Sequence, residues 1–411
     1  MIRLCAGNPH DWLQRYRSQR PIFVCIFSFT ETALIPGISA AGISPSDRLT
    51  TAIADAALLR PQPCKDSASN LPNTGPVAAS NATRPTVLAD SAIGTRLAPP
   101  LPKLAAGVSP ALISRAVLTA LSIPTLLFST GLPQALNVPH VALPKAIAKS
   151  VSTGHAMPLQ QVQALFAAGW YWGERLARQY PGHYLVLGEC VVGGTTTAQA
   201  VLTALGYDVQ ERMSSSHLNG NHAQKQTVIK AGLSQWTTSK PLNPLAAIAT
   251  VGDPMQAVAA GMALGASQKE TTPSGSSKKS EGPSCGVLLA GGSQMLAVYA
   301  LITAIATQLD SQLSEKDKDA VVSNIVVGTT RWVVEDTSAD TIAIAQQVQA
   351  PYLASQLNFS QSPYMQLRAY ERGYVKEGVG AGGCAIAAHL YRQWTNAQLR
   401  HAIEAQLRQW L

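Results

Sequence analysis

The sequence predicts an α/β protein with a doubly wound, Rossmann-like parallel sheet flanked by helices. The main observation is a repeated unit: a short apolar run, then glycines, then apolar residues at helical spacing. The unit occurs at 185–206, 246–265 and 286–305, and a fourth apolar run, 324–327, ends at Gly328. Strands that alternate with helices predict parallel pairing with right-handed crossovers. The loops after such strands line one crevice, where ligands bind.

The first of these units has the features of an anion site. Gly193 and Gly194 lead into Thr195 and Thr196 at the predicted helix start. Glycines let backbone N–H groups approach a ligand closely, threonines cap helices, and the helix dipole favours negative charge. No Gly-Lys-Ser/Thr follows, so this is not a Walker loop. One such loop alone is most simply an ordinary turn, but its repetition favours a ligand-binding edge.

Composition excludes several classes of protein. A chain of 411 residues can hold one large or two medium domains. The net charge of +8 comes from scattered basic residues with few interleaved aromatics, so we expect no nucleic-acid interface and favour anionic small molecules. The cysteines form no CxxC pair and no cluster with histidine. This pattern argues against a structural metal site or disulfide framework and fits a reducing cytoplasm.

No apolar run is long enough to span a bilayer. Basic residues before the apolar run 22–29 imitate a signal peptide, but the run is short and Thr30-Glu31-Thr32 replaces a cleavage site. We therefore expect a buried strand there, no membrane association, and a cytoplasmic protein.

The predicted organisation has three parts. Residues 1–20 form an extension of uncertain order, 21–375 form the α/β domain, and 376–411 form a loop and a helix that pack with N-terminal helices as a smaller helical unit. Flexible inserts are expected at 60–83 and 267–284, which are rich in Pro, Ser, Asn or charged residues. The other expected elements are strands at 23–29, 86–88 and 124–129, helices at 49–59, 110–121 and 159–178, a polar loop leading into a helix over 214–233, and a solvated helix face at 315–319.

Glu377 is the most informative residue near the C-terminus. It lies between Lys376 and a glycine run that includes Gly378 and Gly380, just before an apolar helix. The run satisfies GxGxxG, but too little chain follows for a dinucleotide-binding unit. A partly desolvated carboxylate on such a loop can act as a general base; a surface Lys-Glu pair explains the pattern equally well.

Several of these motifs resemble the nicotinate-nucleotide–dimethylbenzimidazole phosphoribosyltransferase family. GECVVGGTTTA resembles its Gly-Glu-Met-Gly-Ile-Gly-Asn-Thr-Thr loop, VGDPMQAVAAGMALGA its Gly-Gly-x-Glu-Ile-Ala-Ala-Met-Ala-Gly segment, and VKEGVGAGG its Leu-Gly-Glu-Gly-Thr-Gly-Ala segment. AQKQTVI resembles its Ala-Arg-Lys-x-x-Val segment. The resemblance runs from about Phe23 to Leu390. It is closest to a divergent branch, with TETALIPGISAAG and GTTRWVVEDTSAD as further matches.

The resemblance implies transfer of a phosphoribosyl group from nicotinate mononucleotide to an aromatic base such as 5,6-dimethylbenzimidazole, without cofactor or metal. Glu377 would be the catalytic base, and Lys225 would contact the phosphate. Gly193, Gly194, Thr195 and Thr196 would complete the phosphate site, with Gly378 and Gly380 beside the substrate. Glu189 is a second carboxylate near the sugar or base, or an anchor for its own loop. The resemblance also implies a homodimer.

Three further residues carry weaker expectations. Asp253 is expected to cap a helix rather than to catalyse. His155 and His217 are possible polar lining, with solvent exposure the simpler expectation for each. The chain has Val191-Val192-Gly193-Gly194 and 215–220 where better-known members have glycine-rich turns, so the accepted base stays open. A non-catalytic nucleotide-binding protein, or a nucleosidase or transferase that uses another base such as adenine, is the alternative.

Overall fold

The computed structural model describes residues 1–60, 101–102, 104, 106–218, 220–234, 236, 243–268, 284–308 and 321–411. The described residues form an eight-stranded sheet in the order β1-β8-β7-β6-β5-β2-β3-β4. Its strands are β1 (Ile2–Ala6), β2 (Pro21–Phe27), β3 (Thr125–Ser129), β4 (Val141–Ala142), β5 (Tyr184–Cys190), β6 (Gly286–Ala290), β7 (Ile325–Thr330) and β8 (Tyr352–Ser355).

The strand order is that of a doubly wound sheet. The chain runs from β2 outward to β3 and β4, returns to the other side of β2 as β5, and continues through β6, β7 and β8. All these strands pair in parallel, while β1 pairs antiparallel with β8 at the edge. The prediction of a doubly wound α/β fold is confirmed, and the antiparallel edge strand is the difference. The direction of winding reverses between β2 and β5, which is where such sheets bind ligands.

Alternating side chains of the sheet build two separate cores. In β2 all seven residues are buried. Ile22, Val24 and Ile26 enter one core, and Phe23, Cys25 and Phe27 enter the other. A strand covered on both faces reads as a continuous apolar run because each face of the sheet packs against helices.

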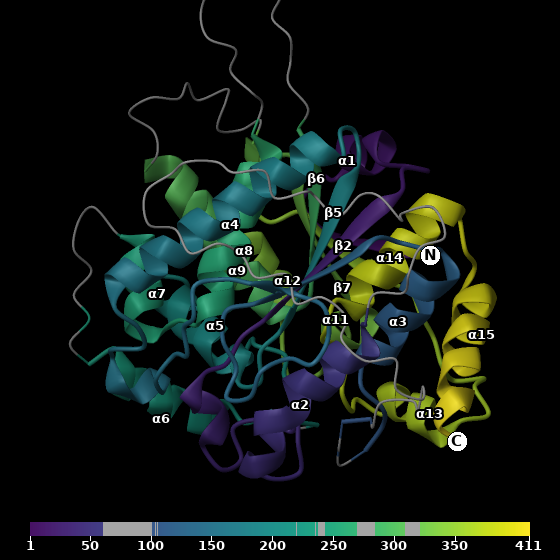
Figure 1. The fold of residues 1–411 in the computed structure, drawn as a ribbon. Helices are drawn as coiled ribbons and strands as arrows, with labels where there is room; N and C mark the ends of the chain where they lie inside the picture. Colours follow the sequence, from purple (N-terminus) through teal and green to yellow (C-terminus); the bar gives the residue numbers. More distant parts are fainter. Residues whose placement is uncertain are drawn as a thin grey trace, which may run out of the picture.

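Each core is closed by its own layer of helices (Figure 1). One layer contains α4 (Leu159–Gln179), α5 (Gly194–Ala204), α7 (Pro244–Val251), α8 (Pro254–Ser267) and α9 (Ser293–Gln308). The other contains α3 (Ala111–Ala120), α14 (Ala381–Arg392) and α15 (Asn396–Leu407), with α2 (Pro45–Leu58) beside them. The C-terminal helices α14 and α15 thus pack with α3 from the first third of the chain.

Local sequence explains where several helices begin. Ser44 and Asp47 form a capping box at α2, with Pro45 at its first position. Thr395 and Gln398 form another at α15. These side chains satisfy backbone N–H groups that the first turn leaves free.

The predicted strand in 246–265 is wrong. The segment forms α7 and α8, which are joined at Gly252 and Asp253. Asn243 accepts a hydrogen bond from the N–H of Ala246, and Pro244 occupies the first helical position. A short apolar run does not distinguish a buried strand from a buried helix. Here the cap and the alanines favour the helix.

The first twenty residues are part of the fold rather than a separate extension. They form β1 and α1 (His10–Arg15), and Trp12 and Tyr16 are buried. The Trp12 indole donates to the carbonyl of Asn324, and the Tyr16 hydroxyl donates to the Asn324 side chain. These contacts tie the N-terminus to the start of β7.

The remaining helices are shorter. They are α6 (His222–Gly232), α11 (Arg331–Val334), α12 (Thr341–Gln347) and α13 (Met365–Glu371), with 3-10 turns at Glu31–Leu34, Val151–Thr153 and Arg408–Trp410. The predicted strand at 86–88, the helix face at 315–319 and nearly all of the two predicted inserts lie outside the described residues.

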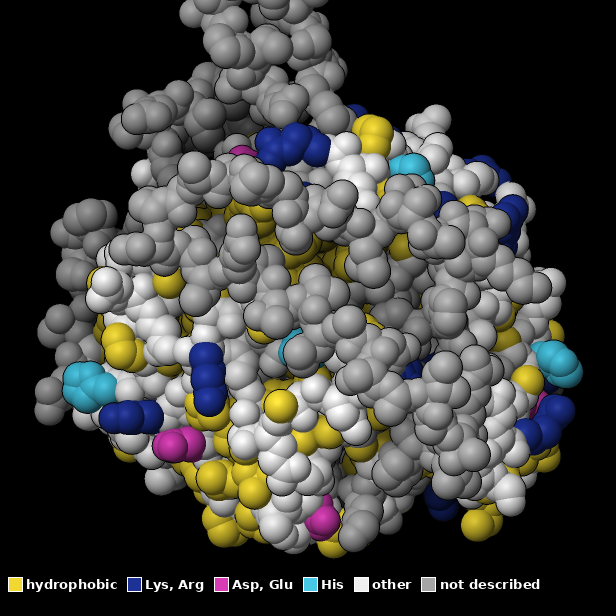
Figure 2. All heavy atoms as spheres, viewed as in Figure 1, with side chains coloured by type: hydrophobic (Ala, Val, Ile, Leu, Met, Phe, Trp, Pro, Cys, Tyr) yellow, Lys and Arg dark blue, Asp and Glu magenta, His cyan; other side chains and the backbone are white. Residues whose placement is uncertain are grey.

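Two surface properties bear on function. Lys and Arg side chains lie in small separate groups on the face shown in Figure 2, in keeping with the scattered basic residues of the sequence. Within the described residues, no helix has the length and apolar character that crossing a bilayer requires.

Candidate active site

A cavity lies at the carboxyl ends of the central strands, at the edge where the sequence predicted ligand binding. Its walls come from the ends of β5 and β6, the start of α5, the side of α2 and the chain just before α14. The lining includes residues 38–41, Thr51, Asp55, Ser109, Pro110, 189–196, 214–216, 292–294 and 374–379.

The glycine loop after β5 forms one wall of this cavity. Gly193 has φ of +82° and precedes the first residue of α5. A Cβ on Gly194 would lie 1.8 Å from the Gln294 side-chain nitrogen, so a larger residue there would require Gln294 to move. Thr195 is half-buried, while Thr196 is fully buried and its hydroxyl has no hydrogen-bond partner among the described residues. The predicted anion-binding loop therefore lines the cavity with its helix N-terminus.

Glu189 ends β5 and anchors this loop. Its Oε2 accepts hydrogen bonds from the backbone N–H of Val191 (3.0 Å) and from the amide of Gln294 (3.3 Å). Burial, together with the nearby Asp253 carboxylate, raises the pKa of Glu189 to about 8. Its carboxyl group is therefore largely protonated at neutral pH.

Glu377 lines the same cavity but is held by four donors. Its Oε2 accepts from the Thr329 hydroxyl (3.0 Å) and the Thr330 N–H (2.8 Å), and its Oε1 accepts from the N–H groups of Gly378 and Gly382, each 3.1 Å away. Burial raises the pKa of Glu377, and the four hydrogen bonds oppose that rise. Because Gly382 lies in the first turn of α14, this carboxylate also stabilises the helix N-terminus. Glu377 therefore does not form a surface ion pair with Lys376.

The loop that carries Glu377 is tightly constrained. Val375, Lys376 and Val379 have positive φ, as do Gly378 and Gly380. Positive φ is unfavourable for β-branched valine and persists only where surrounding contacts hold it.

Three contacts on this loop hold that conformation. The Val379 N–H donates to the carbonyl of Glu189 (3.1 Å), and the Ser114 hydroxyl donates to the Val379 carbonyl (2.7 Å). A Cβ on Gly188 would lie 3.1 Å from the Cα of Gly380, so the glycines allow close packing of the loop on β5. They serve the packing of this loop rather than a dinucleotide fingerprint.

Lys376 and Lys225 are two buried amines beside the cavity. Lys376 forms an ion pair with Asp336 (2.6 Å) and donates to the carbonyl of His217 (3.0 Å). Lys225, on α6, is fully buried, and its Nζ has no partner among the described residues. Burial and the nearby Lys376 charge lower the pKa of Lys225 to about 7. Lys376 lines the cavity, whereas Lys225 does not.

Of the three weaker candidates, Asp253 and His155 are as expected and His217 is not. Asp253 caps α8 in a capping box with Gln256 and accepts from Thr197 (2.5 Å), so the capping prediction is confirmed. His155 is exposed, as expected. His217 is half-buried and its Nε2 has no partner among the described residues, so the expectation of solvent exposure was wrong for it. Its backbone is held against Lys376, which keeps its ring close to the protein.

Sequence reasoning missed Asp55. This residue of α2 is 4% exposed and lines the cavity. It accepts hydrogen bonds from Ser109 Oγ (2.5 Å) and from Cys190 Sγ (3.5 Å). Burial raises the pKa of Asp55 to about 6. The only sequence clue was a lone acid among the alanines of a predicted helix, which does not predict contacts with Ser109 or Cys190.

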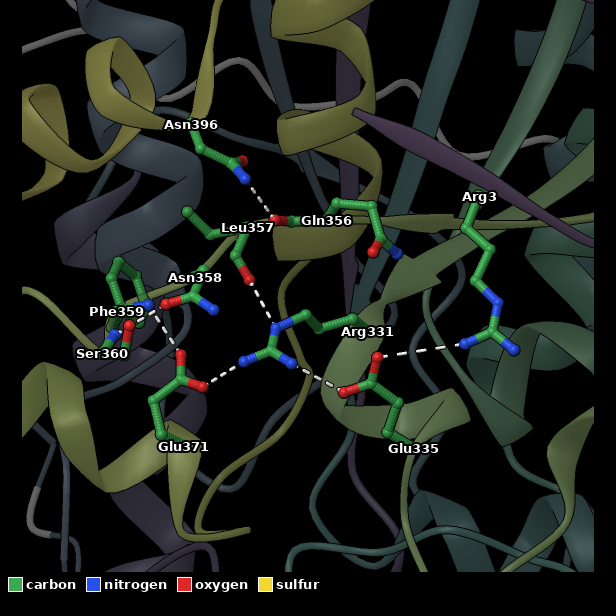
Figure 3. Close-up of polar contacts among 10 residues, drawn as sticks. All are labelled: Arg3, Arg331, Glu335, Gln356, Leu357, Asn358, Phe359, Ser360, Glu371 and Asn396. Atoms are coloured by element: carbon green, nitrogen blue, oxygen red, sulfur yellow. Dashed lines mark hydrogen bonds and ion pairs between the residues drawn. The ribbon is translucent and has the colours of Figure 1, made fainter.

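A group of ionic contacts supports the cavity from outside. Arg331 directly follows Thr330 and bridges Glu371 and Glu335 while donating to the carbonyl of Leu357 (Figure 3). Within the described residues, no three His, Cys, Asp or Glu side chains converge in a way that could hold a metal ion.

Comparison with known proteins gives three results. A family model described as a phosphoribosyltransferase matches residues 133–272. UPF0284 proteins from Gloeothece citriformis and Crocosphaera subtropica are 47% and 45% identical to this chain, over 97% and 98% of it and 94% and 97% of their own lengths. Among solved structures, CobT from Thermus thermophilus has a similar fold, with a TM-score of 0.57 at 14% identity over 96% of this chain and 90% of that one.

A second Thermus thermophilus structure, named as a nicotinate-nucleotide–dimethylbenzimidazole phosphoribosyltransferase, gives a TM-score of 0.55 at 13% identity, over 96% of this chain and 89% of that one. At such low identity these two structures establish the fold alone. The relatives, which match nearly the whole chain at 45–47% identity, establish the family. The chain belongs to the UPF0284 family, and a phosphoribosyltransferase family model matches its residues 133–272.

Proposed function

We propose that this protein transfers a phosphoribosyl group from nicotinate mononucleotide to a ring nitrogen of an aromatic base, such as 5,6-dimethylbenzimidazole. The product would be an α-ribazole phosphate-type nucleotide, as in the cobalamin lower ligand. The observation that carries the proposal is the meeting of Glu377 with the glycine loop of α5 in one cavity. The phosphoribosyltransferase match over 133–272 and the CobT-like fold support it.

The chemistry needs little beyond alignment and a proton acceptor. The lone pair of the ring nitrogen attacks the anomeric carbon while the bond from that carbon to the nicotinate nitrogen breaks. That nitrogen carries positive charge in the donor, so its electron pair returns to a neutral pyridine ring. The N–H proton of the new nucleotide passes to Glu377, which the resemblance assigns as base. A buried cavity that aligns the two reactants lowers the entropic part of the barrier.

The donor phosphate would lie at the N-terminus of α5. There the backbone of Gly193 and Gly194, the hydroxyls of Thr195 and Thr196 and the helix dipole favour an anion. Lys225 would favour the phosphate electrostatically. A dianion bound nearby would raise the pKa of its unpartnered amine and so favour the charged form. The 214–216 segment lines the cavity between these groups and Lys376.

The decisive test is a product assay with Glu377→Gln. Purified protein is incubated with nicotinate mononucleotide and 5,6-dimethylbenzimidazole, benzimidazole or adenine, and released nicotinate and ribotide are quantified. We expect wild type to form a ribotide with at least one base and the variant to be slower by roughly a hundredfold or more, the scale of losing a general base.

Glutamine keeps the side-chain shape and can still accept from Thr330 or Gly382, so the fold should persist. Circular dichroism of the variant checks this. Tight nucleotide binding without product from any base would favour the non-catalytic alternative. Nicotinate release without a ribotide would favour a nucleosidase.

Lys225→Met tests the phosphate site separately. We expect the KM for nicotinate mononucleotide to rise about 10-fold with a smaller change in kcat, because a nearby positive charge that favours the bound phosphate is lost. Removing an unpartnered buried amine should also raise the unfolding free energy of the ligand-free protein. Lys230→Met, on the exposed face of the same helix, is the control and should change neither quantity. An unchanged KM in Lys225→Met contradicts the assignment.

Three further expectations complete the proposal. A homodimer and a reaction without cofactor follow from the resemblance, and a cytoplasmic location follows from the cysteine pattern. Sedimentation equilibrium would test the first, with the mass of two chains as the expected result.

A further inference from the structure

The cavity contains a carboxylate that the proposed reaction does not use. Asp55 on α2 lines the cavity and is 4% exposed. Glu377 accepts the proton in the proposed reaction, and Glu189 accepts hydrogen bonds from Val191 and Gln294. Asp55 has neither task.

The hydrogen bonds of Asp55 leave it with unused acceptor capacity. Its two oxygens accept one hydrogen bond each, from Ser109 Oγ and Cys190 Sγ. Both donors are neutral, and in the described part of the chain no Lys, Arg or His forms an ion pair with Asp55. An ionised carboxylate offers about four lone-pair sites and donates nothing. A buried acceptor of this kind is unfavourable unless a donor reaches it.

The surroundings of Asp55 suit an aromatic ring. Pro102, Leu104, Ala106 and Pro110 line the cavity together with Asp55, and so do Val192 and Val379. The Glu377 loop closes against this wall, since a Cβ on Gly378 would lie 3.3 Å from Pro110 Cγ. Apolar walls with one placed polar group are typical of sites that bind and orient a flat heterocycle.

Two other buried polar side chains of the same cavity have an atom without a partner in the described part of the chain. Ser215 is 8% exposed and Gln294 is 7% exposed, both line the cavity, and neither Ser215 Oγ nor Gln294 Oε1 has a partner among the described residues. Buried polar groups in folded proteins are nearly always satisfied. Ser215 Oγ and Gln294 Oε1 are therefore available to hydrogen bond with a polar ligand.

Resting on the proposed function, we propose that Asp55 is a specificity residue that selects aromatic acceptor bases bearing an exocyclic amine. A benzimidazole with only alkyl substituents has one N–H, and the reaction transfers that proton to Glu377. Such a base has no second donor for Asp55. An amino-substituted ring supplies one, and its amine hydrogen bonds to Asp55 while the attacking nitrogen faces the anomeric carbon.

The test compares bases that differ only in the amine. The pairs are benzimidazole with 4-aminobenzimidazole, and purine with adenine, each with nicotinate mononucleotide as donor. We expect wild type to favour the amino member by about tenfold or more in kcat/KM, since a site built to accept a hydrogen bond discriminates against a ligand that lacks the donor. In Asp55→Asn, whose neutral amide oxygen accepts a hydrogen bond more weakly than a carboxylate, that ratio should fall several-fold, while the parent base changes only a few-fold.

Asp340→Asn is the matched control because Asp340 caps α12 away from the cavity. It should keep the wild-type ratio. If Asp55→Asn does not fold, Asp55→Ser replaces it, since serine is smaller and still polar. A wild-type ratio near one, or a preference that survives undiminished in both Asp55 variants, overturns the proposal and leaves Asp55 as a tie between α2 and Ser109.

Calorimetry separates this inference from the proposed function. If wild type forms no product with any base, the binding of each amino and parent base is measured directly. A preference for the amino base that falls several-fold in Asp55→Asn would uphold the role of Asp55 while the transferase fails. Equal binding of both members would overturn the role of Asp55 as well.

Discussion

At the scale of single residues, the environment assigns different roles to three carboxylates of one cavity. The pKa of Asp55 is raised to about 6, that of Glu189 to about 8, and that of Glu377 is also raised, with burial as the largest cause in each. Their hydrogen bonds differ more than their burial does. Groups whose surroundings separate their pKa values can divide acid, base and recognition roles among themselves.

Glu189 gives a prediction about stability and pH. Its pKa is about 8 in the folded protein against an ordinary value of 4.5, so the folded state binds the extra proton between these values. Stability contributed by this group is complete below pH 4.5 and is lost as the pH rises through 8. The Glu189→Gln variant should not show this loss of stability with rising pH, because a glutamine side chain does not titrate. Urea unfolding between pH 5 and 9 should show the stability of the variant rising relative to that of wild type, by roughly 4 kcal/mol across this range, because each pKa unit corresponds to about 1.4 kcal/mol.

A difference between the two proteins that stays constant with pH would contradict this prediction. It would mean that the Glu189 carboxyl group titrates in the folded state as it does in the unfolded chain.

At the scale of secondary-structure elements, glycines allow the backbones of α4 and α8 to pack in direct contact. A Cβ on Gly169 would lie 2.2 Å from the carbonyl of Val258, and one on Gly261 would lie 2.2 Å from the carbonyl of Phe166. Gly173 and Gly265 repeat the arrangement one turn later. Residues four apart lie on one helix face, so each helix presents a glycine groove to the other. This contact holds together the helix layer that contains α5.

Gly169→Ala should therefore destabilise the protein although alanine is the better helix former. The added methyl overlaps a backbone carbonyl, and overpacking of this kind costs about 1–3 kcal/mol, more than the gain in helix propensity of at most about 1 kcal/mol. Denaturant unfolding measures the difference. Gln163→Ala, on the exposed side of α4, should change stability by less than about 0.5 kcal/mol. A stabilised Gly169→Ala would show that the helices can separate freely.

At the scale of the whole molecule, one arginine joins segments far apart in the chain. Arg331 binds Glu335 just after α11, Glu371 in α13 and the carbonyl of Leu357 after β8 (Figure 3). Glu335 in turn lies 3.9 Å from Arg3 of β1. Arg331 and Glu371 are less than a fifth exposed. Because Thr330 donates to Glu377, this group also supports the cavity.

Arg331→Met should lower the unfolding free energy by about 1–3 kcal/mol, because Glu371 would lose its cation in a partly buried place. Arg3→Met removes only an exposed pair and should cost less than about 1 kcal/mol. Thermal or urea unfolding compares the two. Equal effects would show that the Arg331 contacts contribute no more than a surface ion pair.

The fold was largely predictable because its causes are local. The β5, β6 and β7 runs, the glycine loop at Gly193 and the helix after Glu377 follow from hydrophobic periodicity and from glycine at the turns. The segment 246–265 failed because a short buried run has no periodicity of its own. Residues 1–20 were missed because β1 is a half-exposed edge strand without an apolar run.

The sequence by itself determined the doubly wound sheet, the edge at which the cavity lies and the glycine loop that lines it, since these depend on residues close together in the chain. Only the tertiary structure decided that Glu377 is held by Thr329 and Thr330, that Lys225 is buried without a partner, and that Asp55 meets Ser109 and Cys190 in the cavity wall. Those contacts join residues about 50 to 135 positions apart. No local pattern encodes them, because burial and pKa depend on everything that packs around a group.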